Sequence, residues 1–256
     1  MEMSKLETLY TNRIKNKRDI KKMKYMYILL MFPIVHQIIF SYLPMYGVIL
    51  AFKDFKFGLG IFGSNWVGFA NFKRLLDDPF FKRVFKNTLK LSITNILVSM
   101  PTTVLFALLI NELKDNAFKK IVQTISYMPH FLSWVVIASF IYQLLSPEHG
   151  VFNIFLTKLG LIKEPIYFMA IKRYFLAIFL ISGLWANVGW GSILYLSTIA
   201  SVEQSQYESA DIDGANRYQK ALYITIPAIV PTFTVVLLLN IGNVLNVGFD
   251  QVFNLL

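Results

Sequence analysis

The chain has 256 residues and no cysteine; 55% of its residues are apolar and only 16% are charged, with a mean hydropathy of +0.53. Soluble domains carry about 25% charged residues, so this composition excludes a water-soluble globular domain, a disordered chain and a disulfide scaffold. It indicates a polytopic membrane protein.

The net charge of +10 is concentrated at the N-terminus, where eight of the 25 basic residues lie within the first 24 positions. This basic stretch directly precedes an apolar run that begins at Tyr25. Because positive charge on the cytoplasmic side orients a first membrane helix, residues 1–24 are predicted to form a cytoplasmic segment. The placement favours membrane orientation over nucleic-acid binding. The apolar run is longer than a signal-peptide core and no small-residue cleavage site follows it, which predicts a retained anchor.

Five stretches without Asp, Glu, Lys or Arg reach the roughly 20 apolar residues that a membrane helix needs. We therefore predict an all-α transmembrane domain over residues 25–256. The expected spans cover about residues 25–47, 91–111, 121–145, 174–200 and 222–247.

The connections between these spans follow from a cytoplasmic N-terminus. Residues 47–86 and 148–173 are then outside, and residues 203–220 form a cytoplasmic loop. The uncharged stretch 57–72 is too short and too rich in glycine to span, and we expect it to lead into an interfacial segment at 71–81.

Several kinds of chemistry have no support in the sequence. The chain lacks a phosphate-binding G-x-x-x-x-G-K-[ST] loop, and His36, His130 and His149 form no metal-binding pattern, so each is interpreted as a packed or interfacial side chain. Ser192 follows Gly-Trp-Gly without the G-x-S-x-G order of a nucleophile, and the small residues there predict close helix packing. We therefore predict no catalytic residue, no metal site and no cofactor bound by this chain.

The expected spans are also poor in ionisable residues. Their uncharged stretches contain no Asp, Glu, Lys or Arg, and the histidines in them are His36 and His130. Proton-driven carriers need buried carboxylates or a histidine relay, so the pattern argues against a proton-coupled pump. An intramembrane enzyme is a further alternative, but it requires a nucleophile, a metal site or paired carboxylates at membrane depth.

Aromatic and amide side chains in the later spans are candidates for a solute pathway. Aromatic rings stack on sugar faces and amides bond hydroxyl groups, although helix packing and interfacial anchoring account for the same residues equally well. The candidates are Trp185, Asn187, Trp190, Asn240 and Asn243.

The predicted cytoplasmic loop carries the clearest local pattern. Residues 207–213 are long enough for two helical turns, with Ser205 as the expected N-cap and Glu208 at capping-box spacing. Gly214 suits a helix C′ position, which requires positive φ. Pro227 and the next proline are expected to kink the following span or to mark its start. On this reading the loop is a short surface helix anchored by membrane helices, suited either to docking or to a plain connection.

The spacing of this loop resembles the EAA loop of binding-protein-dependent ABC importer permeases. The matching residues are Glu208-Ser209-Ala210, then Gly214, then Ile224 and Ile226-Pro227, with Ser209 in place of the usual second alanine and Ile226 in place of leucine. The wider chain, over about residues 20–255, resembles sugar-importer permeases of the type I, MetI-like fold.

The resemblance implies an importer subunit that moves an oligosaccharide-type solute by alternating access. It implies a coupling helix that docks on a separate cytoplasmic ATPase, which would bind ATP and Mg. It also implies a second homologous permease, expected to be a different chain, and an extracellular lipid-anchored solute-binding protein. The residues that it assigns to ATPase coupling are Glu208, Ser209, Ala210, Asp211, Asp213, Gly214, Arg217 and Pro227.

The family pattern has one more membrane helix after the span that follows the EAA loop, whereas this sequence ends at Leu256. We therefore expect the final family helix to be missing from these residues. This expectation leaves an inactive or regulatory membrane scaffold as an alternative to a working permease.

Overall fold

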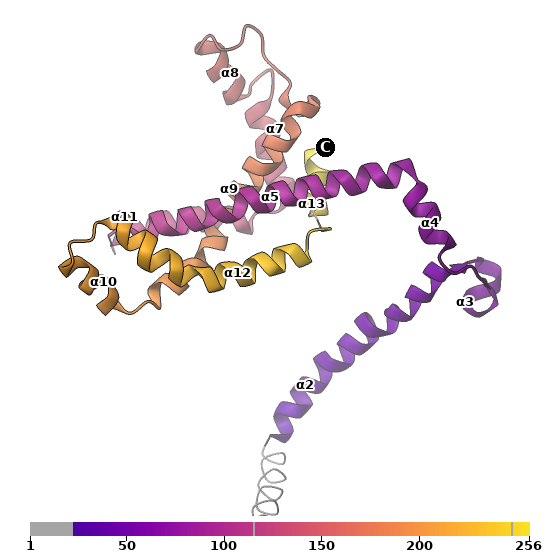
Figure 1. Ribbon diagram of the computed structural model, residues 1–256. Helices are drawn as coiled ribbons and strands as arrows, with labels where there is room; N and C mark the ends of the chain where they lie inside the picture. Colours follow the sequence, from indigo (N-terminus) through magenta and orange to yellow (C-terminus); the bar gives the residue numbers. More distant parts are fainter. Residues whose placement is uncertain (1–22, 115, 247) are drawn as a thin grey trace, which may run out of the picture. The chain divides into compact units, whose positions relative to one another are not determined.

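A computed structural model describes residues 23–114, 116–246 and 248–256 (Figure 1). The predicted basic segment 1–24 therefore lies outside the described residues, apart from its last two positions. Within the described part, four helices are long and apolar enough to cross a membrane, or five crossings if one bent pair of helices is a single span. The prediction of an all-α polytopic membrane protein is confirmed. The four helices cover Lys24–Phe52, Pro79–Asn111, Lys172–Ala200 and Arg217–Gly242.

The chain divides into two compact units, one up to Lys82 and one from Arg83 to the end. The first unit opens with a continuous helical run built from α2 (Lys24–Gln37), η1 (Ile38–Tyr42) and η2 (Leu43–Phe52). The run widens into a π turn at η1 just before Pro44. Proline lacks an N–H and its ring crowds the carbonyl four residues earlier, so the wider turn relieves that clash.

The rest of the first unit is a small folded connection. Strands β1 (Lys53–Asp54) and β2 (Asn65–Trp66) pair antiparallel, with Lys53 opposite Trp66. Between and after them lie the short helical segments η3 (Phe57–Leu59), α3 (Gly60–Gly63) and α4 (Ala70–Asp77). Helix α5 (Pro79–Asn111) follows directly, and the Asp78 carboxylate accepts a hydrogen bond from the Phe80 amide at its start. The predicted interfacial segment 71–81 is thus divided between α4 and the first turn of α5.

The second unit contains the bent pair. The helix predicted for the span 121–145 is broken, because α6 (Ala117–Tyr127) with η4 (Met128–Phe131) meets α7 (Trp134–Leu145) at 104°. Leu132 and Ser133 are extended between them, and the Ser133 hydroxyl caps α7 by accepting from the Val136 amide. The uncharged composition concealed this break, which the Pro129 and Ser133 pair produces by ending one helix and capping the next.

Helix α7 connects to α9 (Lys172–Ala200) through α8 (Val151–Lys158) and η5 (Phe168–Ala170). Asn153 is the centre of this connection. Its side-chain amide donates to the carbonyls of Leu145, Ser146 and Ile166, at 3.0–3.1 Å, and its carbonyl accepts from the Ile166 amide at 2.8 Å. The side chain is fully buried, so these four bonds fix the connection to the end of α7.

Helix α9 is the central helix of the second unit. Its buried Tyr195 and Ile199 form a core with Ala107 of α5 and Ile229 of α12 (Ile226–Gly242). A Cβ at Gly189 would collide with the backbone carbonyl of Ser126 in α6. The small residues of α9 therefore allow close helix packing, as predicted, and the Ser192 hydroxyl is buried and bonded to the Gly189 carbonyl.

The last helix, α13 (Phe249–Leu255), packs against α7 and α9. The buried Gln251 amide donates to the Phe179 carbonyl at 2.7 Å and lies 3.2 Å from the Ser182 hydroxyl. These bonds join the end of the described chain to the first half of α9.

Candidate functional site

The loop predicted to be cytoplasmic folds into two short helices, α10 (Gln204–Ile212) and α11 (Arg217–Lys220), before η6 (Ala221–Thr225) and α12. The N-cap of α10 is Glu203, not Ser205 as predicted. Glu203 adopts the extended conformation that ends the preceding turn, so the helix begins two residues earlier than predicted and Ser205 lies inside it. The Ser205 carbonyl accepts a hydrogen bond from the Ser209 hydroxyl. The expected capping box with Glu208 is therefore wrong.

The C-terminus of α10 matches the prediction. Gly214 has φ +76° at the C′ position. The Gly214 amide donates to the Asp211 carbonyl at 3.1 Å, and the Ala215 amide donates to the Ala210 carbonyl at 2.9 Å. Together these two bonds form a Schellman motif, which stops the helix at a fixed residue and sets the direction of the exit.

Helix α11 begins with a capping box that the sequence analysis missed. The Asn216 side chain accepts from the Gln219 amide at 3.0 Å, and the Gln219 side chain accepts from the Asn216 amide at 2.8 Å. An asparagine followed three residues later by glutamine is a known helix-start signature and was sufficient to find it. The turn between α10 and α11 is consequently defined on both sides.

Three side-chain links hold this loop against the membrane helices. The Tyr207 hydroxyl lies 2.9 Å from the hydroxyl of the buried Thr225 in η6. The Lys220 ammonium donates to the Asp211 carboxylate at 2.6 Å, with the lysine side chain largely covered. Arg217 and Glu112, which follows α5, form a looser and exposed pair at 3.8 Å. These links therefore connect helix α10 to the start of the α12 run and fix its position.

The outward surface of the loop combines acidic and apolar side chains. Glu208, Ser209, Asp211, Asp213 and Gly214 are exposed, while Ala210 is partly covered. Ile212 is 87% exposed and Tyr218 is 86% exposed. Two large apolar side chains held in fixed positions beside carboxylates form a surface suited to contact with another protein.

Pro227 lies at the start of α12, immediately after the π turn η6. The π turn precedes this proline as it precedes Pro44 in the first unit, and the same steric reason applies. The expectation that Pro227 marks a kink or a start in this span agrees with its position.

Among the predicted pathway residues, the structure brings Asn187 and Trp190 together around His130. The His130 ring stacks on the Trp190 ring with centroids 4.8 Å apart and planes 4° from parallel. The His130 Nδ1 atom lies 3.1 Å from the Asn187 carbonyl oxygen. His130 is packed, as interpreted, but it also lines a cavity of about 460 Å³ with Asn187, Asp250 and Asn254. Sequence reasoning missed His130 and the two residues of α13.

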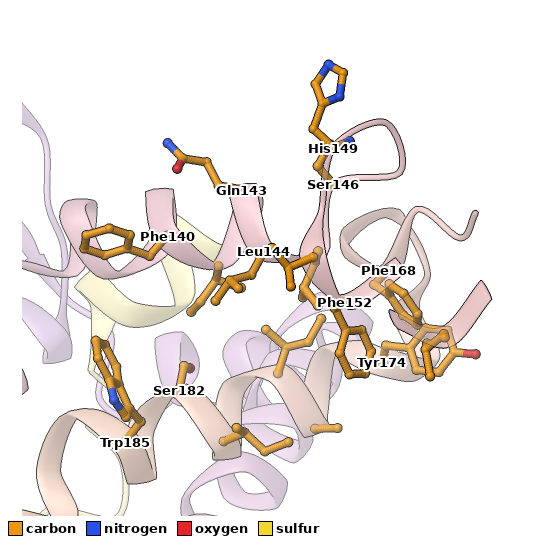
Figure 2. A pocket seen from close by; sticks show the side chains of 17 residues that line it. Phe140, Gln143, Leu144, Ser146, His149, Phe152, Phe168, Tyr174, Ser182 and Trp185 are labelled. Atoms are coloured by element: carbon orange, nitrogen blue, oxygen red, sulfur yellow. The ribbon is translucent and has the colours of Figure 1, made fainter. Parts of the chain in front are cut away.

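Trp185 lies in a different cavity, of about 1230 Å³, between α7, α8 and α9. Figure 2 shows Trp185 and Phe140 at one end of it and Phe152, Phe168 and Tyr174 at the other, while His149 points away. Its walls are mainly apolar and aromatic, so it offers few groups that would bond a hydroxyl-rich solute.

Asn240 and Asn243 do not line either of these two cavities. Each side-chain amide donates to a backbone carbonyl of its own helix four residues earlier, at 2.8 Å to Val236 and 2.9 Å to Leu239. The predicted five-residue set is therefore separated into three places.

Comparison with known proteins places these features in a family. Residues 82–247 match the family model described as the binding-protein-dependent transport system inner membrane component. Protein LplB of Bacillus subtilis is 40% identical over 91% of this chain and 73% of its own length. The polygalacturonan/rhamnogalacturonan transport system permease protein YteP of the same organism is 39% identical over 91% of this chain and 72% of its own length.

A solved structure is also similar. A chain in the crystal structure of a bacterial ABC transporter involved in the import of the acidic polysaccharide alginate superposes with a TM-score of 0.82 and 39% identity. The match covers 93% of this chain and 79% of that chain.

Proposed function

The chain belongs to the family of inner membrane components of binding-protein-dependent transport systems, with the MetI-like importer fold, and we propose that it is the permease subunit of an ATP-driven carbohydrate importer. The proposed solute is an oligosaccharide. The names of the relatives, which refer to polygalacturonan, rhamnogalacturonan and alginate, support a carbohydrate of this kind.

The observation that carries the proposal is the geometry of the 203–227 loop. An exposed helix ends in a fixed Schellman turn and is tied to the α12 run by Tyr207–Thr225 and Asp211–Lys220. A push on α10 is then transmitted to a membrane helix instead of being absorbed in a loose loop. We assign ATPase docking to Glu208, Ser209, Ala210, Asp213 and the exposed apolar side chains beside them.

In the proposed mechanism this chain hydrolyses nothing. A separate cytoplasmic ATPase binds ATP and Mg, and closure of its two copies moves α10. A permease pair has two states, open inward or outward, and ATP changes their relative populations. The pair would contain a second, homologous permease, and a lipid-anchored extracellular binding protein would deliver the solute. The N-terminus would be cytoplasmic, on the same side as α10.

The proposed solute contacts are in the cavity around His130. Of the stacked His130 and Trp190 rings, His130 lines the cavity and offers an aromatic surface, and Asn187, Asp250 and Asn254 offer groups that bond hydroxyls. This combination of a flat apolar surface with a few polar groups is typical of carbohydrate recognition. Trp185, Asn240 and Asn243 are not part of this proposed contact set.

Co-purification tests the docking role. The full chain is extracted from its membrane in detergent with the ATPases of the cell, as the native sequence and as Glu208→Lys. We expect an ABC ATPase to co-purify with the native chain and to be lost with Glu208→Lys. The matched control is Glu164→Lys, a charge reversal at an exposed residue of the other long connection.

A folded native chain that recovers no ATPase would contradict the proposal and favour a membrane scaffold. Equal ATPase recovery with Glu208→Lys would show that α10 is not the docking helix. Monodisperse elution of each variant establishes that the chain is folded.

A further inference from the structure

The connection between the first helical run and α5 is a folded element, which we call the 53–78 element after its residues. The Lys53 ammonium donates to the Ile61 carbonyl at 2.7 Å, and the Asn71 amide donates to the carbonyls of Ala51 and Lys53 at 3.0–3.1 Å. The hydroxyl of the buried Ser64 donates to the Gly60 carbonyl at 2.7 Å. These bonds hold the element against the end of η2, so its surface side chains have fixed positions.

An aromatic cluster joins the element to the helix that precedes it. Phe52, the last residue of η2, stacks on Trp66 with centroids 5.6 Å apart and also contacts Phe69 and Phe72 at 5.3–5.5 Å. Despite these contacts, Trp66 and Phe69 are mostly exposed within the described residues. The cluster therefore uses one side of these rings for packing and leaves the other available.

Further out, the element presents large apolar side chains with no cover in this chain's described residues. Phe57 is 95% exposed and Phe62 is 85% exposed. A rigid surface that holds several phenylalanines outward marks an interaction site, because in water it would lose the free energy of burying them. We therefore expect a partner to cover these phenylalanine side chains.

The position of the element in the chain identifies the partner as the bilayer. The element begins where the apolar run Lys24–Phe52 ends and finishes where α5, also long enough to span, begins. The element is thus flanked on both sides by helices that are long and apolar enough to cross a membrane. The ends of membrane spans lie at the depth of the headgroups, where aromatic side chains gather.

The charges of the element agree with this depth. Three exposed basic residues, Lys56, Lys73 and Arg74, lie among the exposed aromatic side chains, while the Lys53 ammonium is bonded to the Ile61 carbonyl. Lysine and arginine at this level extend their charged ends toward phosphates while their stems cover apolar surface. Helix α4 carries both basic and exposed apolar side chains, since Leu75 and Leu76 are exposed and follow Arg74 in the sequence.

We propose that the 53–78 element is an interfacial anchor, with Phe57 and Phe62 inserted below the phospholipid headgroups and the basic side chains at the level of the phosphates. The anchor fixes the depth of the first helical run and the start of α5 in the membrane. This assignment is independent of the proposed solute and of ATPase docking, since it depends on the first unit alone.

Because this chain has no cysteine, a single introduced cysteine carries the only spin label on the chain, and the wild-type preparation gives the background from co-purifying subunits. Phe57→Cys and Phe62→Cys are labelled with a nitroxide and reconstituted, with the subunits that co-purify, into vesicles of phosphatidylcholine and phosphatidylglycerol. We expect the ratio of oxygen accessibility to nickel-chelate accessibility to be several-fold higher at both positions than at the exposed control Glu164→Cys. Equal, water-like ratios at the three positions would overturn the proposal.

A second measurement avoids labels in case either variant does not fold. Brominated phospholipids quench tryptophan near the headgroups, and we expect them to quench the wild-type chain more than Trp66→Phe, with Trp134→Phe as the matched control. Unchanged quenching in Trp66→Phe would contradict the anchor. A label that is water-exposed in vesicles and becomes protected only when a solute-binding protein is added would also overturn it, in favour of a protein-docking surface.

Discussion

The two connections on either side of α9 contain the same local elements but are stabilised in different ways. Each holds a short helix, α8 or α10, and each helix ends in a Schellman turn with glycine at positive φ: Gly160 at +70° and Gly214 at +76°. Around α8 the fixing group is the fully buried Asn153. Around α10 the fixing groups are Tyr207 and Asp211, which bond to Thr225 and Lys220 of the next helical run, and none of the described residues of α10 is buried.

The difference shows how the same local motif serves two purposes. A connection centred on a buried polar side chain is stabilised from within and needs no partner. A connection held by two side-chain links to the next helical run leaves its other side chains exposed, so its turn determines the direction in which it presents them. The α10 connection has the construction expected of a docking element, and the following variants test that contrast.

The largest effect on stability is expected at Asn153. Asn153→Ala removes four hydrogen bonds and leaves buried backbone groups without partners, so we expect the free energy of unfolding to fall by roughly 2–4 kcal/mol. Glu208→Ala, on the exposed face of α10, should change it by less than about 0.5 kcal/mol. Thermal denaturation in detergent, followed by size-exclusion chromatography, measures both. Equal shifts for the two variants would remove the contrast between the connections.

The matched glycines give the next largest effect. Valine at positive φ is strained by at least about 1–2 kcal/mol, and neither Gly160 nor Gly214 has another atom within 4 Å of an added Cβ. Gly160→Val and Gly214→Val should therefore destabilise the chain similarly. We expect ATP-dependent solute uptake in vesicles to fall about tenfold only for Gly214→Val. Normal uptake by Gly214→Val would contradict the coupling role of the turn.

The Tyr207–Thr225 link gives a smaller effect. Tyr207→Phe removes the hydroxyl bonded to Thr225, which should cost about 1 kcal/mol. Because α10 is then less firmly tied to the α12 run, we expect more ATP hydrolysed per solute molecule imported. Tyr167→Phe is the control, since that ring is 51% exposed and lies in the connection on the other side of α9. The hypothesis is rejected if both variants keep the native ratio of hydrolysis to uptake.

The smallest effect is expected at Arg217. Its pair with Glu112 is exposed and 3.8 Å long, so Arg217→Gln should cost no more than about 0.5 kcal/mol, and less at high salt. Lys220→Gln removes the shorter and better covered pair with Asp211 and should cost more. Denaturation at two salt concentrations compares them. A larger loss at Arg217 would reverse the order of the links.

The sequence was sufficient for features that depend on local spacing. Four of the five long apolar runs match single helices that are long enough to cross a membrane, and Gly214 was predicted at C′ because a helix end followed by glycine is a local pattern. The Ser205 cap was wrong for a related reason: Glu203 and Ser205 both lie near the start of the same helix, and the preceding turn made Glu203 the N-cap. The docking role assigned to these residues is still a prediction.

Features that depend on distant residues could not be predicted. The uncharged stretch 121–145 has the composition of one helix whether or not Leu132 and Ser133 are extended. The local sequence gives no sign of the role of Asn153, because that role depends on the fold bringing Ile166 next to it. His130 joins Asn187 and Trp190 only because α6 and η4 pack on α9, and no spacing in the sequence records that contact.

The close contact between α9 and α6 has a consequence for how this sequence can vary. Any replacement at Gly189 adds at least a Cβ, which would overlap the backbone carbonyl of Ser126. A side chain at position 126 cannot compensate, because the colliding atom belongs to the main chain. Substitutions elsewhere on α9 can be matched by changes in a neighbouring side chain, whereas position 189 has no such neighbour to adjust. We therefore expect glycine to be retained at position 189 in functional variants of this sequence.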